Sequence, residues 1–192
     1  MGQVRSFFAV RIEQEVAARI AQAQAGLKQS EASVKWVAPA NFHFTLKFLG
    51  GVEDGAIPAL IAAAARELAG AASFPLRAAG LGAFPGLTRP RVIWAGITEG
   101  REALVALAER IERACEEQGF PREQRPFSTH LTLGRVREGG ELGDLPERLR
   151  EASELEFGET AVDRVVLMES RLHPEGPEYL VQAEFELKGE AG

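Results

Sequence analysis

Residues 42–50 read "FHFTLKFLG", and they decide the fold because apolar and polar side chains alternate along them. Successive side chains of a β-strand point to opposite faces of the sheet. His43 and Thr45 therefore share one face, about 6.8 Å apart along the strand. The apolar residues expected on the other face are Phe42, Phe44, Leu46 and Phe48. We predict a strand over residues 42–49, ending at Gly50-Gly51.

The pattern recurs in "THLTLGR", residues 129–135. His130 and Thr132 again share one face of a predicted strand, and Leu131 and Leu133 bury the other. The chain has only three histidines, and two of them precede x-Thr-Leu, which disfavours coincidence. Each motif thus presents an imidazole and a hydroxyl on a face whose reverse is apolar.

The segments around the motifs alternate between strand and helix patterns. Apolar residues recur at helical spacing in three segments, and Phe- and Val-rich runs of 4–12 residues separate them. Asp54 is expected to cap the second helix, and a short helix is expected after the second motif. The resulting order, β-α-β-β-α-β-β-α-β-α-β-β, favours an α+β fold. The predicted helices lie at about residues 13–29, 54–70 and 102–118, and the final strands are "TAVDRVVLMESRL" and "EYLVQAEFEL".

Composition limits the possible functions. The chain has 192 residues, 45% of them apolar, which is enough for one domain or two fused lobes. No apolar run is long enough to span a membrane, and no secretory signal is evident. A net charge of −6 argues against a general duplex-DNA binder. The lone Cys115 excludes an internal disulfide and is expected to be buried and inert, which suits the cytoplasm.

Two histidines offer a specific chemistry. Because imidazole has a reference pKa near 6.5, one ring can be neutral while the other is protonated at neutral pH. Displacement at a phosphodiester needs such a pair, with a base for the attacking oxygen and an acid for the departing one. The hydroxyls of Thr45 and Thr132 can donate hydrogen bonds to the phosphate oxygens, where charge accumulates. This chemistry needs no metal ion, and the sequence offers no convincing metal-binding cluster.

The chain resembles the two-histidine phosphoesterase superfamily, and more closely its bacterial and archaeal RNA 2',3'-cyclic phosphodiesterases, historically called 2'-5' RNA ligases. The resemblance covers most of the chain: "RSFFAVRI", "WVAPANFHFTLKFLG", "FPGLTRPRVIWAGI" and "PFSTHLTLGRV". It implies a bilobal α+β fold in which two antiparallel sheets flank a central cleft, with helices on the outer faces and one motif in each lobe. Residues 1–192 would form this single two-lobed domain.

The resemblance also implies hydrolysis of a 2',3'-cyclic phosphate to a 2'-phosphomonoester, without cofactor or metal. The expected substrates are RNA ends or small cyclic nucleotides, with no membrane or protein partner, and a monomer is the default state. His130 would activate water as proton acceptor, and His43 would protonate the departing 3'-oxygen as proton donor. The pair is nearly symmetric, so the reverse assignment stays open. Two alternative functions also stay open: 2'-5' RNA end joining, and a non-catalytic module that binds RNA ends or nucleotides.

Three residues beside the motifs have ambiguous orientations. By strict alternation Arg135 points away from His130, unless the strand bends at Gly134; the resemblance favours an arginine that contacts substrate. Lys47 shares the face of His43 and lies either at the cleft edge or in solvent. Phe48 is expected to pack in the core, with a position beside a nucleobase as the alternative.

Overall fold

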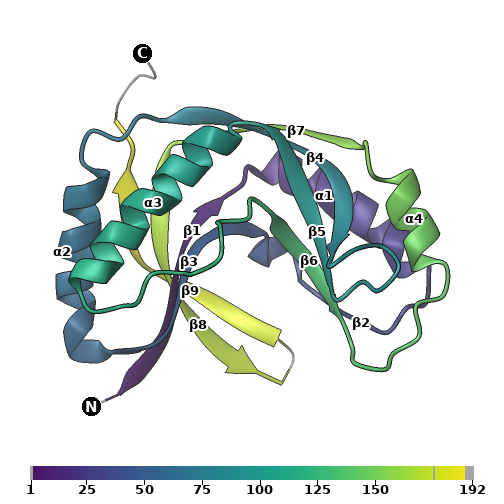
Figure 1. Ribbon diagram of the computed structural model, residues 1–192, viewed down its shortest axis with the longest axis horizontal. Coiled ribbons are helices and arrows are strands. Elements are labelled where there is room, and N and C mark those ends of the chain that lie inside the picture. Colours follow the sequence, from purple (N-terminus) through teal and green to yellow (C-terminus); the bar gives the residue numbers. More distant parts are fainter. Residues whose placement is uncertain (1, 175, 189–192) are drawn as a thin grey trace.

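The computed structural model describes residues 2–174 and 176–188, and within them strands form a curved layer with helices outside it (Figure 1). The strands are β1 (Gln3–Arg11), β2 (Val34–Trp36), β3 (His43–Glu53), β4 (Phe74–Phe84), β5 (Val92–Glu99), β6 (Leu131–Val136), β7 (Glu156–Val162), β8 (Arg164–His173) and β9 (Gly176–Glu186). The helices are α1 (Gln14–Lys28), α2 (Ile57–Leu68), α3 (Arg101–Glu117) and α4 (Leu145–Glu151), with 3-10 turns η1 (Pro39–Asn41) and η2 (Asp54–Ala56).

The strand order places the two motifs side by side. It runs β7-β4-β5-β6-β3-β1-β8-β9, all pairs are antiparallel, and β2 pairs with the free part of β6. One residue pair, Phe44 with Leu131, joins β3 to β6 and so connects the two halves. The predicted α+β class is therefore confirmed, and the two expected sheets are halves of one curled sheet. We call the half with β1, β3, β8 and β9 the first lobe, and the half with β4–β7 and β2 the second lobe.

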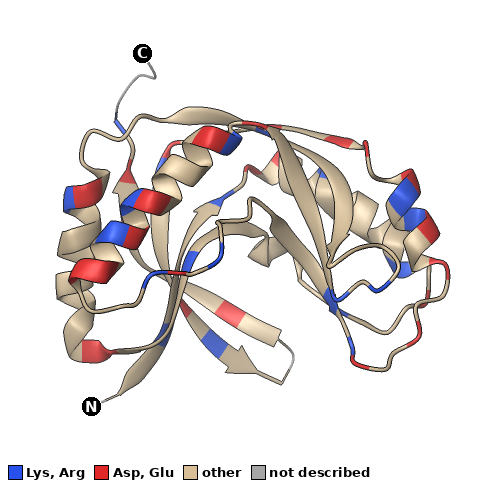
Figure 2. Cartoon of the chain, viewed as in Figure 1, with Lys and Arg blue, Asp and Glu red and all other residues tan. Residues whose placement is uncertain are grey.

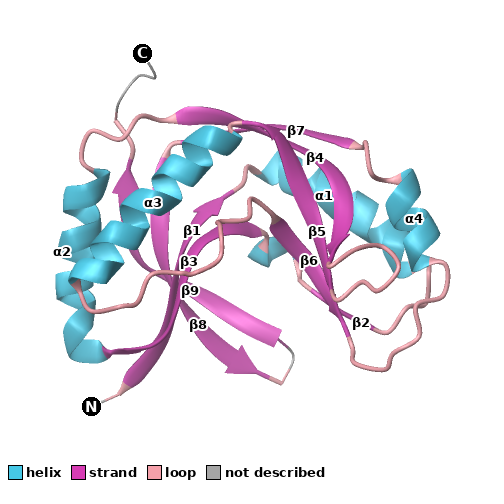
Figure 3. Cartoon of the chain, in the orientation of Figure 1, coloured by secondary structure: helices cyan, strands magenta, loops and turns pink. Residues whose placement is uncertain are grey.

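The helices cover the outer side of both lobes (Figure 3). Helix α1 follows β1 of the first lobe but packs against β7 of the second, while α3 follows β5 of the second lobe but packs against β3 of the first. Leu104 and Ile111 on α3 are fully buried, as the predicted apolar stripe requires. This exchange of helices ties the lobes together, and one apolar core runs through both.

Three local predictions were wrong. β3 continues through Gly50-Gly51 to Glu53, where it pairs with Gln3 of β1. Asp54 does not cap α2: it begins the 3-10 turn η2, and Ala56 precedes the helix without a side-chain cap. The predicted strand "TAVDRVVLMESRL" is divided at Asp163, because β7 pairs with β4 of the second lobe and β8 with β1 of the first. The chain crosses between lobes at that aspartate.

Both motif strands contain a β-bulge directly after the threonine. In β3, Thr45 pairs with Ala9 and Lys47 with Phe8, so Leu46 is an extra residue. In β6, the residues that pair with Trp94 and Ile93 of β5 are Thr132 and Gly134, so Leu133 is extra. A bulge shifts the alternation of side chains by one residue. The two residues after each bulged leucine therefore face the opposite way from the strict pattern, and in β3 a second register shift follows Phe48.

Candidate active site

The register between β3 and β6 places the four motif side chains on one face of the sheet. Phe44 and Leu131 form the pair that joins the strands, and they are 1% and 0% exposed, on the core side. Continuing this antiparallel register sets His43 opposite Thr132 and Thr45 opposite His130, all facing away from the core. Diagonal neighbours in such a pair of strands lie about 7–8 Å apart. The two imidazoles therefore stand at the distance at which long side chains can approach a common group.

His43 is held by hydrogen bonds at both ring nitrogens. Its Nδ1 lies 2.7 Å from the Asn41 carbonyl oxygen, and its Nε2 lies 2.9 Å from Thr45 Oγ1. Because a carbonyl only accepts, Nδ1 carries a hydrogen, and in the neutral ring the Thr45 hydroxyl donates to Nε2. Burial lowers the pKa of His43, and the bond to the Asn41 carbonyl partly opposes that shift. The neutral ring thus presents a basic Nε2 next to a hydroxyl.

His130 is oriented in the same way. Its Nδ1 lies 2.9 Å from the carbonyl oxygen of Ser128, again two residues earlier, so Nδ1 carries the hydrogen and Nε2 the lone pair of the neutral ring. Burial lowers the pKa of His130, the backbone hydrogen bond opposes this, and the positive charge of Arg135 lowers it further. The Phe84 ring stands edge-on to the imidazole, at 5.1 Å between ring centroids and 88° between planes. Both imidazoles are therefore fixed in the same tautomer and orientation relative to their strands.

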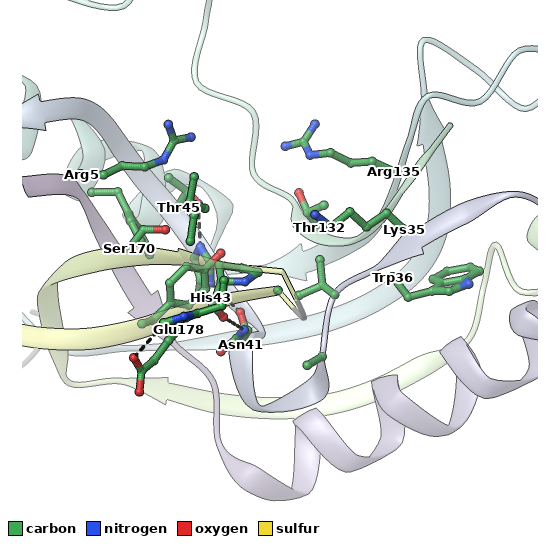
Figure 4. A pocket seen from close by; sticks show the side chains of 18 of the residues that line it. Arg5, Lys35, Trp36, Asn41, His43, Thr45, Thr132, Arg135, Ser170 and Glu178 are labelled. Atoms are coloured by element: carbon green, nitrogen blue, oxygen red, sulfur yellow. Dashed lines mark hydrogen bonds and ion pairs between the residues drawn. The ribbon is translucent and has the colours of Figure 1, made fainter. Parts of the chain in front are cut away.

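A cleft of about 860 Å³ opens beside these residues, within the range of small-molecule sites. Four of the predicted site residues, His43, Thr45, Thr132 and Arg135, line it. The fifth, His130, is not among the lining residues and stands two positions before Thr132 in the chain. The cleft also contains Arg5 and Lys35 (Figure 4).

The cleft is cationic although the protein as a whole is acidic. Arg5, Lys35 and Arg135 take part in no ion pair among the described residues. By contrast, acidic and basic residues are interspersed along the outer helices (Figure 2). Arg122, which follows α3, forms ion pairs with Glu109 and Glu116 of that helix. In a chain of net charge −6, three unpaired cations in one cleft indicate an anionic ligand.

The bulge in β3 reverses the predictions for Lys47 and Phe48. The core position predicted for Phe48 is wrong: the ring is 51% exposed, lines the cleft, and has the Arg5 guanidinium 4.6 Å from its centroid. The cleft-edge or solvated position predicted for Lys47 is also wrong, because its side chain is buried on the helix side. There Nζ donates to Glu112 Oε1 and Oε2 at 3.0 and 2.8 Å, and to the Pro121 carbonyl at 2.8 Å.

The bulge in β6 has the matching effect on Arg135. The expected bend is present, and Arg135 lies exposed at the cleft on the same side as Thr132. Gly134 permits it: a Cβ there would stand 2.7 Å from Val34 Cγ1 and 2.9 Å from Trp36 Cε3. The glycine therefore allows β2 to pack closely against β6 where the strand turns Arg135 inward.

Sequence patterns did not identify several other residues that line the cleft. Arg5 lies near the start of β1, Asn41 ends the 3-10 turn η1, and Tyr179 lies on β9, from the far end of the chain. Trp36 is half-buried and lines the cleft. His173 is exposed and lies 3.4 Å from Glu178 at the cleft edge.

Three further observations concern the cysteine, possible metal ligands and membrane-spanning helices. Cys115 is buried as predicted, and burial raises the pKa of its thiol to about 12, so it stays protonated. The described residues contain no group of three or more His, Cys, Asp and Glu side chains placed to hold a metal ion. Each helix in the described ranges is too short or too polar to span a bilayer.

The fold and the site define an α+β protein with two histidine-threonine motifs on adjacent strands, and a cleft with three cations that form no ion pair among the described residues. Residues 10–94 and 96–179 match the family described as "LigT like Phosphoesterase", one match for each half of the chain. The chain belongs to this family of LigT-like phosphoesterases, which are enzymes.

Relatives of similar length carry one name. A protein of Methanothermobacter thermautotrophicus, named RNA 2',3'-cyclic phosphodiesterase, is 34% identical, over 96% of this chain and 100% of its own. One of the same name from Aquifex aeolicus is 36% identical, over 81% of this chain and 82% of its own. The crystal structure of TT0787 from Thermus thermophilus superposes with a TM-score of 0.79 at 31% identity, covering 97% of this chain and 99% of that one.

A ligand complex is among the similar structures. E. coli LigT complexed with 3'-AMP superposes with a TM-score of 0.76 at 27% identity, covering 97% of this chain and 99% of that chain. A mononucleotide thus binds to a protein of this fold.

Proposed function

We propose that this protein hydrolyses 2',3'-cyclic phosphates of RNA ends or nucleotides to 2'-phosphomonoesters, using His43 and His130 and no metal ion. The observation that carries the proposal is the shared face of the two motifs, where each histidine donates Nδ1–H to a backbone carbonyl. The name shared by the curated relatives supports the choice of substrate.

The proposed reaction is one in-line displacement at phosphorus. His130 Nε2 takes a proton from water as the water oxygen attacks phosphorus. The bond from phosphorus to the 3'-oxygen breaks, and protonated His43 delivers its Nε2 proton to that oxygen. The products are the 2'-phosphomonoester and a free 3'-hydroxyl, and a proton returned through solvent resets the pair. With both Nδ1 atoms held, only the Nε2 atoms take part.

The remaining site residues bind the charge and the base. Thr45, Thr132 and Arg135 donate hydrogen bonds to the non-bridging oxygens, where negative charge increases in the transition state. The exposed Phe48 ring with the Arg5 guanidinium forms a surface on which a nucleobase stacks. The same residues run end joining in reverse, but excess water favours hydrolysis. We further propose that residues 1–192 act as one monomeric two-lobed domain in the cytoplasm.

The test is incubation of the purified protein with a nucleoside 2',3'-cyclic phosphate in excess EDTA. The expected result is a nucleoside 2'-phosphate, formed at the same rate with and without the chelator. A 3'-phosphate product would reject the proposed bond cleavage, and an abolished rate in EDTA would reject the metal-independent mechanism. Tight binding without turnover would indicate the non-catalytic module instead.

A further inference from the structure

Tyr179 stands over the first histidine. Its ring meets the His43 imidazole edge-on, with centroids 5.4 Å apart and planes at 85°, and it meets Phe7 at 5.0 Å and 73°. The residue lines the cleft and is half-buried. None of the hydrogen bonds recorded for the described residues uses its hydroxyl, although a half-buried phenol usually has a partner. The hydroxyl is thus available to a ligand.

The backbone around Tyr179 is tied to the turn that orients His43. Asn41 Nδ2 donates to the Pro177 carbonyl oxygen at 2.9 Å, while the Asn41 carbonyl accepts from His43 Nδ1 at 2.7 Å. One asparagine therefore fixes both the β8–β9 hairpin and the imidazole. Tyr179, two residues after Pro177, is held at a set position relative to His43.

The cations of both lobes act on the same phenol. Burial raises the pKa of Tyr179, while the charges of Arg135 and Arg5 oppose that shift. The hydroxyl therefore remains protonated near neutral pH and can donate. Arg5 and Arg135 extend from opposite walls of the cleft (Figure 4), so the phenol lies within the electrostatic reach of both.

We infer that Tyr179 binds substrate, with its hydroxyl donating a hydrogen bond to a non-bridging oxygen of a phosphate that lies between Arg5 and Arg135. This role rests on the proposed function and deepens it, since it gives the phosphate a donor from the hairpin in addition to Thr45 and Thr132. The hairpin is then part of the phosphate site as well as a wall of the cleft.

The test is Tyr179→Phe, which removes only the hydroxyl and keeps the ring that packs on His43 and Phe7. A hydrogen bond to a charged group accounts for about a 10- to 100-fold effect, so kcat/KM should fall by about that factor. The melting temperature should not change. Val181→Ala is the matched control, since Val181 lies on the same strand, 42% exposed and outside the cleft. A kcat/KM within twofold of the unaltered protein would overturn the inference.

Phosphate binding tests the inference even if the protein hydrolyses no cyclic phosphate. Tyr179 is the only tyrosine, so labelled tyrosine gives one ring signal in NMR spectra. Titration with inorganic phosphate should shift that signal saturably. The Kd measured on the histidine signals should rise about tenfold or more in Tyr179→Phe. An unmoved tyrosine signal or an unchanged Kd would overturn the role of Tyr179, while activity in the cyclic-phosphate assay would leave the proposed function standing.

Discussion

"HFTLKF" of β3 and "HLTLGR", which begins one residue before β6, start alike and then diverge. Through the threonine and the bulged leucine, both present an imidazole and a hydroxyl, and both hold Nδ1 with the carbonyl two residues earlier. Beyond the bulge, the buried position is Lys47 in one strand and Gly134 in the other. The next position, exposed in the cleft, is Phe48 in one and Arg135 in the other.

This comparison separates the shared geometry from the asymmetric binding surface. In the proposed mechanism the common half supplies the two proton-transfer groups, and its similarity in the two strands makes the acid and base nearly symmetric. The divergent half gives the first lobe an aromatic face and the second a guanidinium. A base and a phosphate are therefore expected to bind in one orientation, with the base toward the first lobe.

Substitution of the two shared histidines should have the largest effect on activity. His43→Ala and His130→Ala should each lower turnover by about 10²- to 10⁴-fold, because each removes one of the two proton transfers. The double variant should be little worse than either single one, since the pair acts as a unit. Steady-state hydrolysis of a cyclic nucleotide measures all three. Activity within threefold of the unaltered protein in either single variant would contradict the paired mechanism.

The next largest effect is expected for Lys47, the buried position of β3, and it concerns stability. Lys47→Met leaves the Glu112 carboxylate buried without its partner, which should cost about 3–5 kcal/mol of unfolding free energy. Replacing both residues, Lys47→Met with Glu112→Leu, should restore most of that loss, because no buried charge remains. Urea denaturation measures the difference. A loss of less than about 1 kcal/mol in the single variant would mean that the pair contributes no more to stability than an exposed ion pair does.

Substitutions at the two exposed positions, Phe48 and Arg135, should differ in which substrates they affect. Loss of base stacking in Phe48→Ala should reduce kcat/KM for a cyclic nucleotide by about 5- to 100-fold. A cyclic phosphate without a base, such as that of glycerol, should be nearly unaffected by this change. Arg135→Ala should impair hydrolysis of both substrates, because the proposed mechanism assigns Arg135 to the phosphate. Equal losses on both substrates in Phe48→Ala would mean that Phe48 is not a base platform.

The smallest effect is on the pH profile. Burial lowers the pKa of both His43 and His130 below the ordinary value of 6.5. A lowered pKa keeps a ring neutral to more acidic pH, so both limbs of the kcat/KM profile of the free enzyme move to the acidic side. We expect a bell-shaped profile with its maximum below about pH 6.5. A rate that rises without a maximum through pH 9 would contradict the paired-proton scheme.

The sequence predicted what depends on local alternation, and failed where distant strands intervene. His43 was placed with Thr45, and His130 with Thr132, on one face of each strand, because the apolar residues between them define the reverse face. The orientations of Lys47 and Phe48 were wrong because the bulge is set by pairing with β1, nearly forty residues away.

Likewise, the sequence pattern did not identify Tyr179 as a site residue, because only the folded hairpin brings it to His43. The division at Asp163 was missed for a related reason. Its two sides have one continuous strand pattern, and only the partners β4 and β1 separate them.

A crystal structure with a bound nucleoside 2'-phosphate would test most directly whether two imidazoles from different lobes act on one phosphorus. Phosphate oxygens should lie about 2.6–3.2 Å from Nε2 of both His43 and His130, with the base against Phe48. A phosphate that contacts one ring while the other faces a separate surface would contradict the account.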